Sequence, residues 1–327
     1  MPNPALAQVS DRFIWSAIVV YALAMLAFAA EWAFAARPAA PSVPARTAVP
    51  VLIGATGPAH SAAPPVTPLP PPVTRADRPG TAERLNRVGL ALTWLAFGLH
   101  LAGVLTRGLA VRRVPWGNMY EFSTASAVAA TGVFLALTLR QDVRRLGLFV
   151  VTPVLLTLGL AATVLYTDAE QLQPALQSVW LVIHVIAAVT SAGGFTVGAA
   201  ISGVYLRQQR AERREGHHRT GRLPDAAALD ALAYRVHAFV FPLWTFAVIA
   251  GAIWAEHAWG RYWGWDPKET WAFITWVVYA AYLHARATAG WKGSRAAVIA
   301  LVGFGALMFN YFVINMVITG LHSYAGT

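Results

Sequence analysis

Long apolar runs separated by short polar segments dominate the pattern of hydrophobic and polar positions along this chain. A helix needs roughly 20 mostly apolar residues to cross the hydrocarbon core of a bilayer, and eight runs come close to or exceed that length. They cover residues 13–34, 85–109, 122–139, 146–166, 178–206, 229–255, 270–288 and 296–320. The pattern predicts an all-α, polytopic integral membrane protein with about eight transmembrane helices.

The composition agrees with this prediction. Of the 327 residues, 57% are hydrophobic and 12% are charged, whereas soluble domains carry roughly 25% charged residues. The chain contains no cysteine, so it can form no disulfide, no thiolate metal site and no cysteine nucleophile. Any metal chemistry must therefore rest on histidine or carboxylate side chains.

Three regions are expected along the chain. Residues 1–35 hold the first transmembrane helix, because their apolar run is too long for a signal peptide and only Arg12 precedes it. Residues 36–84 are rich in Pro and Ala. Proline lacks the backbone N–H that a helix or a sheet needs, so we expect a disordered cytoplasmic linker here. Residues 85–327 form the main transmembrane domain.

Basic residues predict the orientation of the helices. They are concentrated between Arg207 and Arg222, and loops rich in Arg and Lys usually face the cytoplasm. Alternation then places loop 167–177, segment 259–271 and the C-terminus on the outer face of the cytoplasmic membrane. The net charge of +10 reflects this topology and requires no nucleic-acid partner. Three residues break the rule, so either the first two spans are misplaced or these side chains have a ligand or partner: Arg107, Arg112 and Arg113.

An aromatic loop joins the predicted sixth and seventh spans. Residues 259–271 read W-G-R-Y-W-G-W-D-P-K-E-T-W and hold four of the 13 Trp residues. One explanation is an interfacial aromatic belt, since Trp and Tyr gather at the headgroup level of membranes. The other is a shelf of rings on which a flat, hydrophobic ligand stacks.

Two histidines are expected beside this loop. His184 lies near the outer end of the fifth predicted span, and His322 lies just beyond the eighth. Two imidazoles from different helices can be the axial ligands of one haem iron, and an ordinary hydrogen-bonded position is the alternative for each. The loop supplies rings for stacking on the macrocycle and cations for its propionates: Trp259, Trp263, Trp265, Arg261 and Lys268.

His284 is expected deeper in the membrane, roughly 20 Å from the outer end of the seventh span. Ionisable groups at such depth are costly and usually functional. A second haem site there needs a second ligand, for which His100 and His237 are candidates, although a structural role is the stronger expectation for both. His257 is expected at the rim of the loop.

At this point the sequence resembles a known family. Residues 259–269 resemble the tryptophan-rich WWD signature of haem-handling proteins, which system I and system II proteins share. Further matches are P-W-G-N-M-Y-E at 115–121, Y-L-H-A-R at 282–286 and G-L-H-S-Y at 320–324. Together they resemble the CcsA/ResC family of system II cytochrome c maturation proteins, over roughly residues 85–327.

The resemblance implies roles for individual residues. His184 and His322 would hold haem b, which is handled as a substrate, at the WWD loop, and Asp266 would complete the signature. His284 would be a transmembrane haem ligand whose opposite ligand comes from a Ccs1/ResB-type membrane partner. The family usually has a small residue at the position of His237, which argues against a shared role for it. Other implied partners are apocytochrome c with a C-x-x-C-H motif and a thiol-reducing, thioredoxin-like protein.

The leading functional hypothesis is a cytochrome c haem lyase subunit that carries haem to the outer face and presents it for thioether formation. A haem exporter or chaperone without ligase activity is one alternative. A b-type electron-transfer subunit is another, but it predicts two buried His pairs that this pattern does not favour. Asp266 is expected to cap the seventh span or to shape the loop, and not to act as an acid or base.

Overall fold

The computed structural model describes residues 2–35, 80–170, 176–215, 223–318 and 320–321, and these residues fold into helices without any β-strand. The predicted 36–84 linker lies outside the described residues, except that α2 already begins at Thr81. The helices and their bounds are α1 Pro4–Ala35, α2 Thr81–Val111, α3 Met119–Arg140, η2 Arg144–Leu146, α4 Gly147–Thr163, α5 Val179–Glu215, α6 Ala226–Trp259, α7 Pro267–Ala287, α8 Ser294–Met308, the π-helix η4 Phe309–Ile314 and α9 Asn315–Val317.

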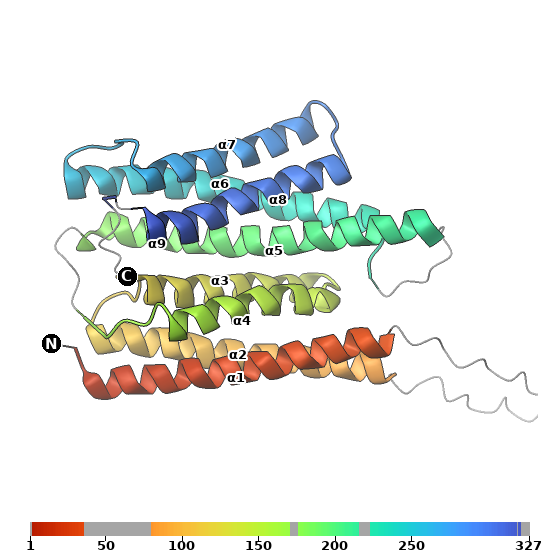
Figure 1. Ribbon diagram of the computed structural model, residues 1–327, viewed down its shortest axis with the longest axis horizontal. Helices are drawn as coiled ribbons and strands as arrows, with labels where there is room; N and C mark the ends of the chain where they lie inside the picture. The colour runs from red at the N-terminus through yellow and green to blue at the C-terminus, as the bar shows by residue number, and fades with distance from the viewer. Residues whose placement is uncertain (1, 36–79, 171–175, 216–222, 319, 322–327) are drawn as a thin grey trace, which may run out of the picture.

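The long helices run nearly parallel or antiparallel to one another and form successive layers (Figure 1). Helices α1 and α2 pair along one side, α3 and α4 occupy the middle, and α5 to α8 form the other side. The most extensive contacts join α1 to α2 and α5 to α6. The larger hydrophobic core lies where α5 meets α6, with Phe195, Val236 and Val240 among its buried side chains.

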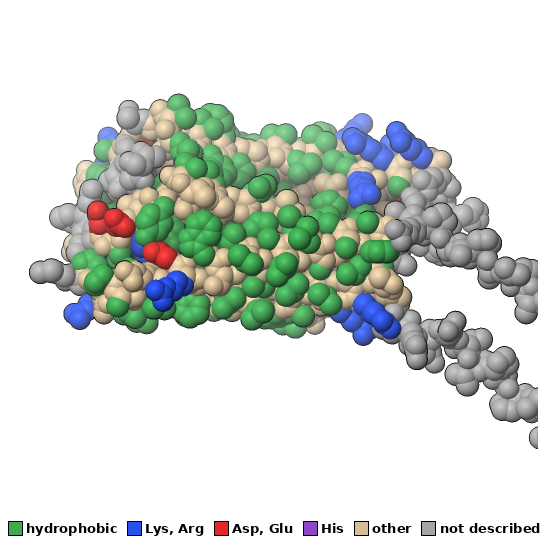
Figure 2. Space-filling model, turned by 60° about the horizontal axis from the view of Figure 1, so that its bottom comes forward, with side chains coloured by type: hydrophobic (Ala, Val, Ile, Leu, Met, Phe, Trp, Pro, Cys, Tyr) green, Lys and Arg blue, Asp and Glu red, His purple; other side chains and the backbone are tan. Residues whose placement is uncertain are grey.

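The prediction of an all-helical, multi-pass membrane protein is confirmed. Seven of the described helices are long and apolar enough to span a membrane, judged by length and composition. The expected span 270–288 falls on α7, which is not among the seven and carries Lys268, Glu269, His284 and Arg286. On α1, large apolar side chains such as Val19 and Leu26 are more than half exposed, as expected of a surface that faces lipid. Figure 2 shows such side chains covering the α1–α2 side of the bundle.

Polar segments separate to the two ends of the bundle. The turn around Arg144, the end of α5 and the α7–α8 turn lie at one end, and the loop between α6 and α7 lies at the other (Figure 1). The start of α1 and the end of α9 lie at the end that carries the aromatic loop (Figure 1). This alternation brings the N-terminal ends of α5 and α7, the C-terminal end of α6 and α9 together at this end of the bundle, which is the arrangement that positions the site.

Two of the three arginines that depart from the expected charge distribution have a partner within the chain. Arg107 and Arg113 both pair with the Glu121 carboxylate of α3, at 3.1 and 2.7 Å. Arg107 and Glu121 are 2% and 0% exposed, and Arg107 also donates to the carbonyl oxygen of Thr167 at 2.6 Å. For Arg107 and Arg113, the structure therefore supports the second explanation, a partner within the chain.

Candidate functional site

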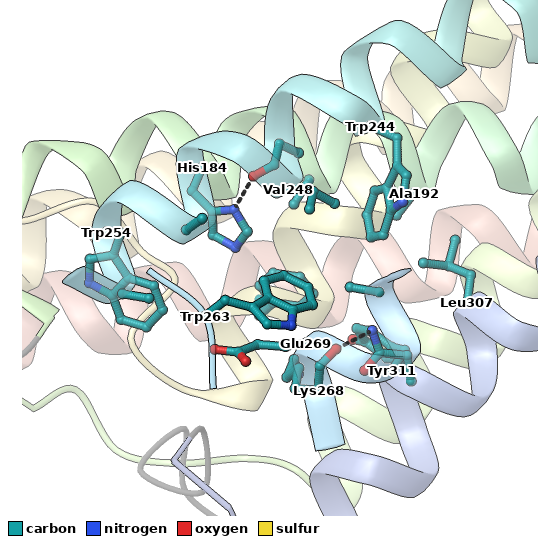
Figure 3. Close-up of a pocket in the computed structure, with 18 of the residues that line it drawn as sticks. His184, Ala192, Trp244, Val248, Trp254, Trp263, Lys268, Glu269, Leu307 and Tyr311 are labelled. Carbon is teal, nitrogen blue, oxygen red and sulfur yellow. Dashed lines mark hydrogen bonds between the residues drawn. The ribbon is translucent and has the colours of Figure 1, made fainter. Parts of the chain in front are cut away.

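A cavity of about 930 Å³, including the space at its mouth, lies at the end of the bundle that carries the aromatic loop (Figure 3). Its walls come from α5, α6, α7, the end of α8 and the π-helix. Most of the lining is apolar or aromatic. The polar and aromatic members of the lining are Phe122, His184, Trp244, Trp254, Trp259, Tyr262, Trp263, Lys268, Glu269, Asn310 and Tyr311.

His184 points from α5 into this cavity, on the opposite side of Trp263 from Lys268 (Figure 3). Its Nδ1 lies 2.7 Å from the backbone oxygen of Ala247 on α6. A carbonyl oxygen only accepts, so Nδ1 carries the proton and Nε2 carries the lone pair. Histidines that bind metals are usually oriented in this way, with the non-ligating nitrogen donating to a carbonyl or carboxylate.

Two neighbours fix the imidazole plane. Trp254 stacks on it, with 6.2 Å between ring centroids and 12° between planes. Gly251, one turn beyond Ala247 on α6, leaves space for the ring, because a Cβ at that position would lie 2.7 Å from Nδ1. The imidazole therefore has one orientation, set by a carbonyl, a stacked ring and a glycine on the same helix.

The aromatic loop is shaped by its own acidic residues. Helix α6 ends with Gly260 in the left-handed conformation. The Glu269 carboxylate then accepts from the backbone N–H of Gly264 at 2.8 Å and of Asp266 at 3.1 Å. Asp266 caps α7 and Pro267 follows at the first helical position, where proline is preorganised for a helix. The prediction that Asp266 caps this helix is confirmed.

The rings of the loop divide into two groups. Trp259, Tyr262 and Trp263 line the cavity. Trp265 is not among the lining residues; it has a positive φ of 56° and is 65% exposed. Its ring meets those of Trp263 and Phe273 edge-on. Two of the three predicted stacking residues therefore face the cavity, and the third faces outward.

The two predicted cations of the loop are also placed differently. Lys268 lines the cavity and donates from Nζ to Oδ1 of Asn315. It precedes the predicted span 270–288, and burial lowers the pKa of its ammonium from 10.5 to about 8, against the opposite effect of the Asp266 carboxylate. Arg261 is exposed and is not among the lining residues.

The Asp266 carboxylate also binds the chain segment that leads to the C-terminus. Oδ1 accepts from the N–H of Lys268 at 3.0 Å, and Oδ2 accepts from the N–H of Leu321 at 2.8 Å. A side chain at residue 320 would collide with it, because a Cβ on Gly320 would lie 2.7 Å from Oδ2. His322, which follows Leu321 in the sequence, lies outside the described residues.

The π-helix contributes two residues that the sequence pattern did not single out. Asn310 and Tyr311 line the cavity, and the Tyr311 hydroxyl bonds to the hydroxyl of Ser123 on α3. π-Helical segments often occur at functional sites. The available signal was the pair Asn310 and Asn315 within an otherwise apolar run.

The remaining candidate histidines lie away from the cavity. His100 and His237 are both 0% exposed. His100 lies 3.5 Å from the Tyr21 hydroxyl, and His237 packs among the rings of Phe195, Tyr279 and Tyr282. His257 is exposed at the rim, as expected. His284 is exposed on α7, far along that helix from the loop.

The fold and the site define a class: a multi-pass helical membrane protein with an aromatic-walled cavity and an oriented imidazole at one end of the bundle. The sequence profile of the family described as "Cytochrome C assembly protein" matches residues 116–322, and the chain belongs to this family.

The chain is also similar in sequence to named cytochrome c biogenesis proteins. It is 35% identical to the cytochrome c biogenesis protein CcsA of Synechococcus elongatus, covering 73% of this chain and 87% of the relative. For the CcsA of Gloeothece citriformis the identity is 33%, covering 74% and 88%.

One solved structure is also similar. "Cytochrome c Heme Lyase CcmF" superposes with a TM-score of 0.63 at 16% identity, covering 94% of this chain and 46% of that one. The chain therefore spans about half the length of that solved chain, and at this identity the likeness shows a common fold. Membership of the family places the role of the chain in cytochrome c biogenesis.

Proposed function

We propose that this chain holds haem b, its substrate, at the aromatic loop and presents it for covalent attachment to apocytochrome c. The observation that carries the proposal is the orientation of His184 at the wall of the cavity, with Nδ1 bound to the Ala247 carbonyl. That bond makes Nε2 the ligating nitrogen, which suits an axial ligand of haem iron. The oriented imidazole is on the wall of a cavity whose other rings can stack on a macrocycle.

The lining of the cavity suits such a ligand, because ligand pockets are mostly apolar and aromatic with a few placed polar groups. Trp259 and Trp263 provide aromatic surface, and Lys268 provides a cation on the lining. The proposed haem-binding set also includes three other residues of the loop. Trp265 and Arg261 are exposed and would contact the edge of the haem. Asp266 would act by shaping the loop.

His322 is proposed as the second axial ligand at this site. The segment before it approaches the loop, since Leu321 is hydrogen-bonded to Asp266. Haem held by two imidazoles is stable until a histidine of the substrate replaces one of them.

His284 is proposed as a transmembrane haem ligand that acts before haem reaches the outer face. Its side chain is exposed on α7, on the side of the bundle that bears the exposed Phe273 and Val277. A histidine facing away from its own bundle within a membrane is costly unless it meets a partner. This supports the proposal that the opposite ligand comes from a Ccs1/ResB-type protein.

The chemistry at the outer face of the cytoplasmic membrane is an addition that needs no oxidant. Each thiol of the C-x-x-C-H motif, kept reduced by a thioredoxin-like protein, adds across one haem vinyl group. A C–S bond forms and the thiol hydrogen goes to the neighbouring vinyl carbon. This chain contributes by fixing the haem plane and the axial ligands, which is catalysis by positioning.

Absorption spectra of the purified protein test the proposal, in the oxidised and reduced states. We expect a low-spin, bis-His spectrum in the wild type that is weakened or lost in His184→Ala and in His322→Ala. His257→Ala is the matched control, because His257 is near the loop but exposed at its rim. Loss of haem in His284→Ala alone, or no haem even with the membrane partner co-expressed, would contradict the outer haem site.

A second assay separates the lyase from its alternative, a haem exporter or chaperone without ligase activity. Wild-type protein with its partner, haem and reduced apocytochrome should yield cytochrome with covalently attached haem. Transfer of haem without thioether formation would favour the alternative.

A further inference from the structure

A second cavity lies at the opposite end of the bundle from the aromatic loop. It is an open groove between the C-terminal end of α5, the N-terminal end of α6, the C-terminal end of α7 and the turn that joins α7 to α8. Figure 2 shows Lys and Arg side chains gathered at this end, and the expected topology places it at the cytoplasmic leaflet. The charged members of the lining are Glu212, Arg213, Asp230, Arg235, Arg286 and Lys292.

Two of these side chains form a mostly buried ion pair. The Arg286 guanidinium donates to both oxygens of the Asp230 carboxylate, at 2.8 and 3.1 Å, and the two side chains are 8% and 16% exposed. Arg286 also lies over the ring of Tyr234, 4.7 Å from its centroid. Asp230 and Arg286 therefore neutralise each other and hold α6 against α7.

The turn between α7 and α8 is fixed at the edge of the groove. The backbone N–H of Gly293 donates to Oδ1 of Asp230 at 3.2 Å. Ser294 Oγ donates to Oε1 of Gln209 on α5 at 2.7 Å. Gly293 has a φ of 75°, a conformation that favours glycine. Lys292, which precedes Gly293, is thereby held on the lining.

The other acidic side chain is also committed to the fold, and three cations remain. The Glu212 carboxylate accepts from the Ala226 N–H at 3.0 Å and from Nε2 of Gln208 at 3.1 Å. The remaining cations are exposed, and none forms an ion pair with a residue that the structure describes. They are Arg213, Arg235 and Lys292. The groove therefore presents positive charge to a ligand.

Arg235 indicates which kind of anion fits. It lies within the expected span 229–255, roughly 9 Å along the helix axis from the beginning of that span. Its guanidinium donates to Oε1 of Gln141 at 3.4 Å. Phe239, one turn further along the same side of α6, is 78% exposed. A cation near the headgroup level followed by an exposed ring matches the phosphate and the acyl chains of a lipid, whereas a soluble anion would leave the ring without a partner.

We propose that this groove binds the headgroup of an anionic phospholipid of the cytoplasmic leaflet. Arg213, Arg235 and Lys292 contact the phosphate, and the acyl chains lie along the Phe239 side of α6. Basic pockets between transmembrane helices on the cytoplasmic side bind such headgroups. The N-terminus of α8 begins beside Lys292 without a side-chain cap from the described residues, so its N–H groups add to the attraction for an anion.

Native mass spectrometry of the full chain measures which lipids remain bound. With phosphatidylglycerol and phosphatidylcholine added to the detergent at equal concentration, we expect the wild type to retain one phosphatidylglycerol in preference to phosphatidylcholine. The test variant is Arg213→Gln/Arg235→Gln/Lys292→Gln. Its affinity for phosphatidylglycerol should be about a hundredfold lower, because each basic residue near an anionic lipid contributes roughly a fivefold factor. Its affinity for phosphatidylcholine should change little.

The matched control is Arg140→Gln/Arg210→Gln/Arg214→Gln. It removes the same charge from exposed positions at the same end of the bundle, and none of these three residues is part of the lining. The control should retain phosphatidylglycerol as the wild type does. Both variants should keep the melting temperature of the wild type in phosphatidylcholine, because all six side chains are exposed.

Four results would overturn the proposal. The first is an unchanged affinity for phosphatidylglycerol in the groove variant. The second is an equal loss in the control, which would mean that attraction is spread over the basic surface. The third is binding of inorganic phosphate or glycerol 3-phosphate as tight as that of the lipid, which would make the ligand a soluble anion. The fourth is a groove variant that keeps the lipid but loses haem, which would assign the three cations to the haem propionates.

Discussion

Replacing Gly251 by alanine should disturb the His184 imidazole more than any change at the mouth of the cavity. The new Cβ would lie 2.7 Å from Nδ1 and 2.8 Å from Cε1 of the ring, and ordinary contact begins at 3.4 Å. The ring must therefore move by about 0.7 Å. It cannot move freely, because it is bonded to Ala247 and stacked on Trp254.

Two contributions determine how much Gly251→Ala lowers the free energy of unfolding. A shift of this size strains or breaks the 2.7 Å bond to Ala247, which contributes about 1 kcal/mol. Inserting a methyl group into a packed core costs about 1–3 kcal/mol. We expect Gly251→Ala to lower the free energy of unfolding by about 2–4 kcal/mol in all and to shift bound haem from the low-spin toward the high-spin form.

Thermal unfolding in detergent and absorption spectra measure the two effects. Gly203→Ala on α5 and Gly305→Ala on α8 are matched controls, because a Cβ at either site meets nothing within 4 Å. Both should be neutral or stabilising by up to about 1 kcal/mol, since alanine favours a helix over glycine. If Gly251→Ala kept both the melting temperature and the haem spectrum of the wild type, the packing account of His184 orientation would be refuted.

Two further predictions concern buried polar residues. Glu121→Gln should destabilise the protein by about 3–5 kcal/mol, because it leaves the arginines at the end of α2 without a counter-charge; Glu83→Gln, at an exposed pair on the same helix, should change the melting temperature little. His237→Leu should leave the haem spectrum and cytochrome maturation unchanged and keep or raise the melting temperature. Both ring nitrogens of His237 are buried with no hydrogen-bond partner among the residues that the structure describes, which is unfavourable, and loss of haem in this variant would show that His237 is a ligand.

Local signals in the sequence were sufficient to predict the N-terminal cap of α7. Asp266, Pro267 and Glu269 follow one another in the order expected of an N-cap, a first helical residue and the third position of a capping box. All these contacts lie within four residues, so they form whenever the segment becomes helical. The same reasoning did not reveal the second oxygen of Asp266, whose partner Leu321 is 55 positions away.

The sequence also could not determine which side chains line the same cavity. His100, His184 and His237 are all histidines within apolar helices, yet only His184 lines the cavity. Which way each points depends on the rotation of its helix relative to neighbours. That rotation is set by packing between helices that are distant in the chain.

The sequence by itself determined the membrane class, the helical runs and the aromatic loop with a histidine near the same face. It could do so because the length and apolarity of a run decide whether it spans a bilayer, and both are properties of a continuous segment. The tertiary structure alone decided that Trp265 turns outward, that Glu121 neutralises Arg107 and Arg113, and that a π-helix brings Asn310 and Asn315 to Lys268. These features depend on the meeting of helices from different parts of the chain, and no periodicity within one segment encodes the direction of its neighbours.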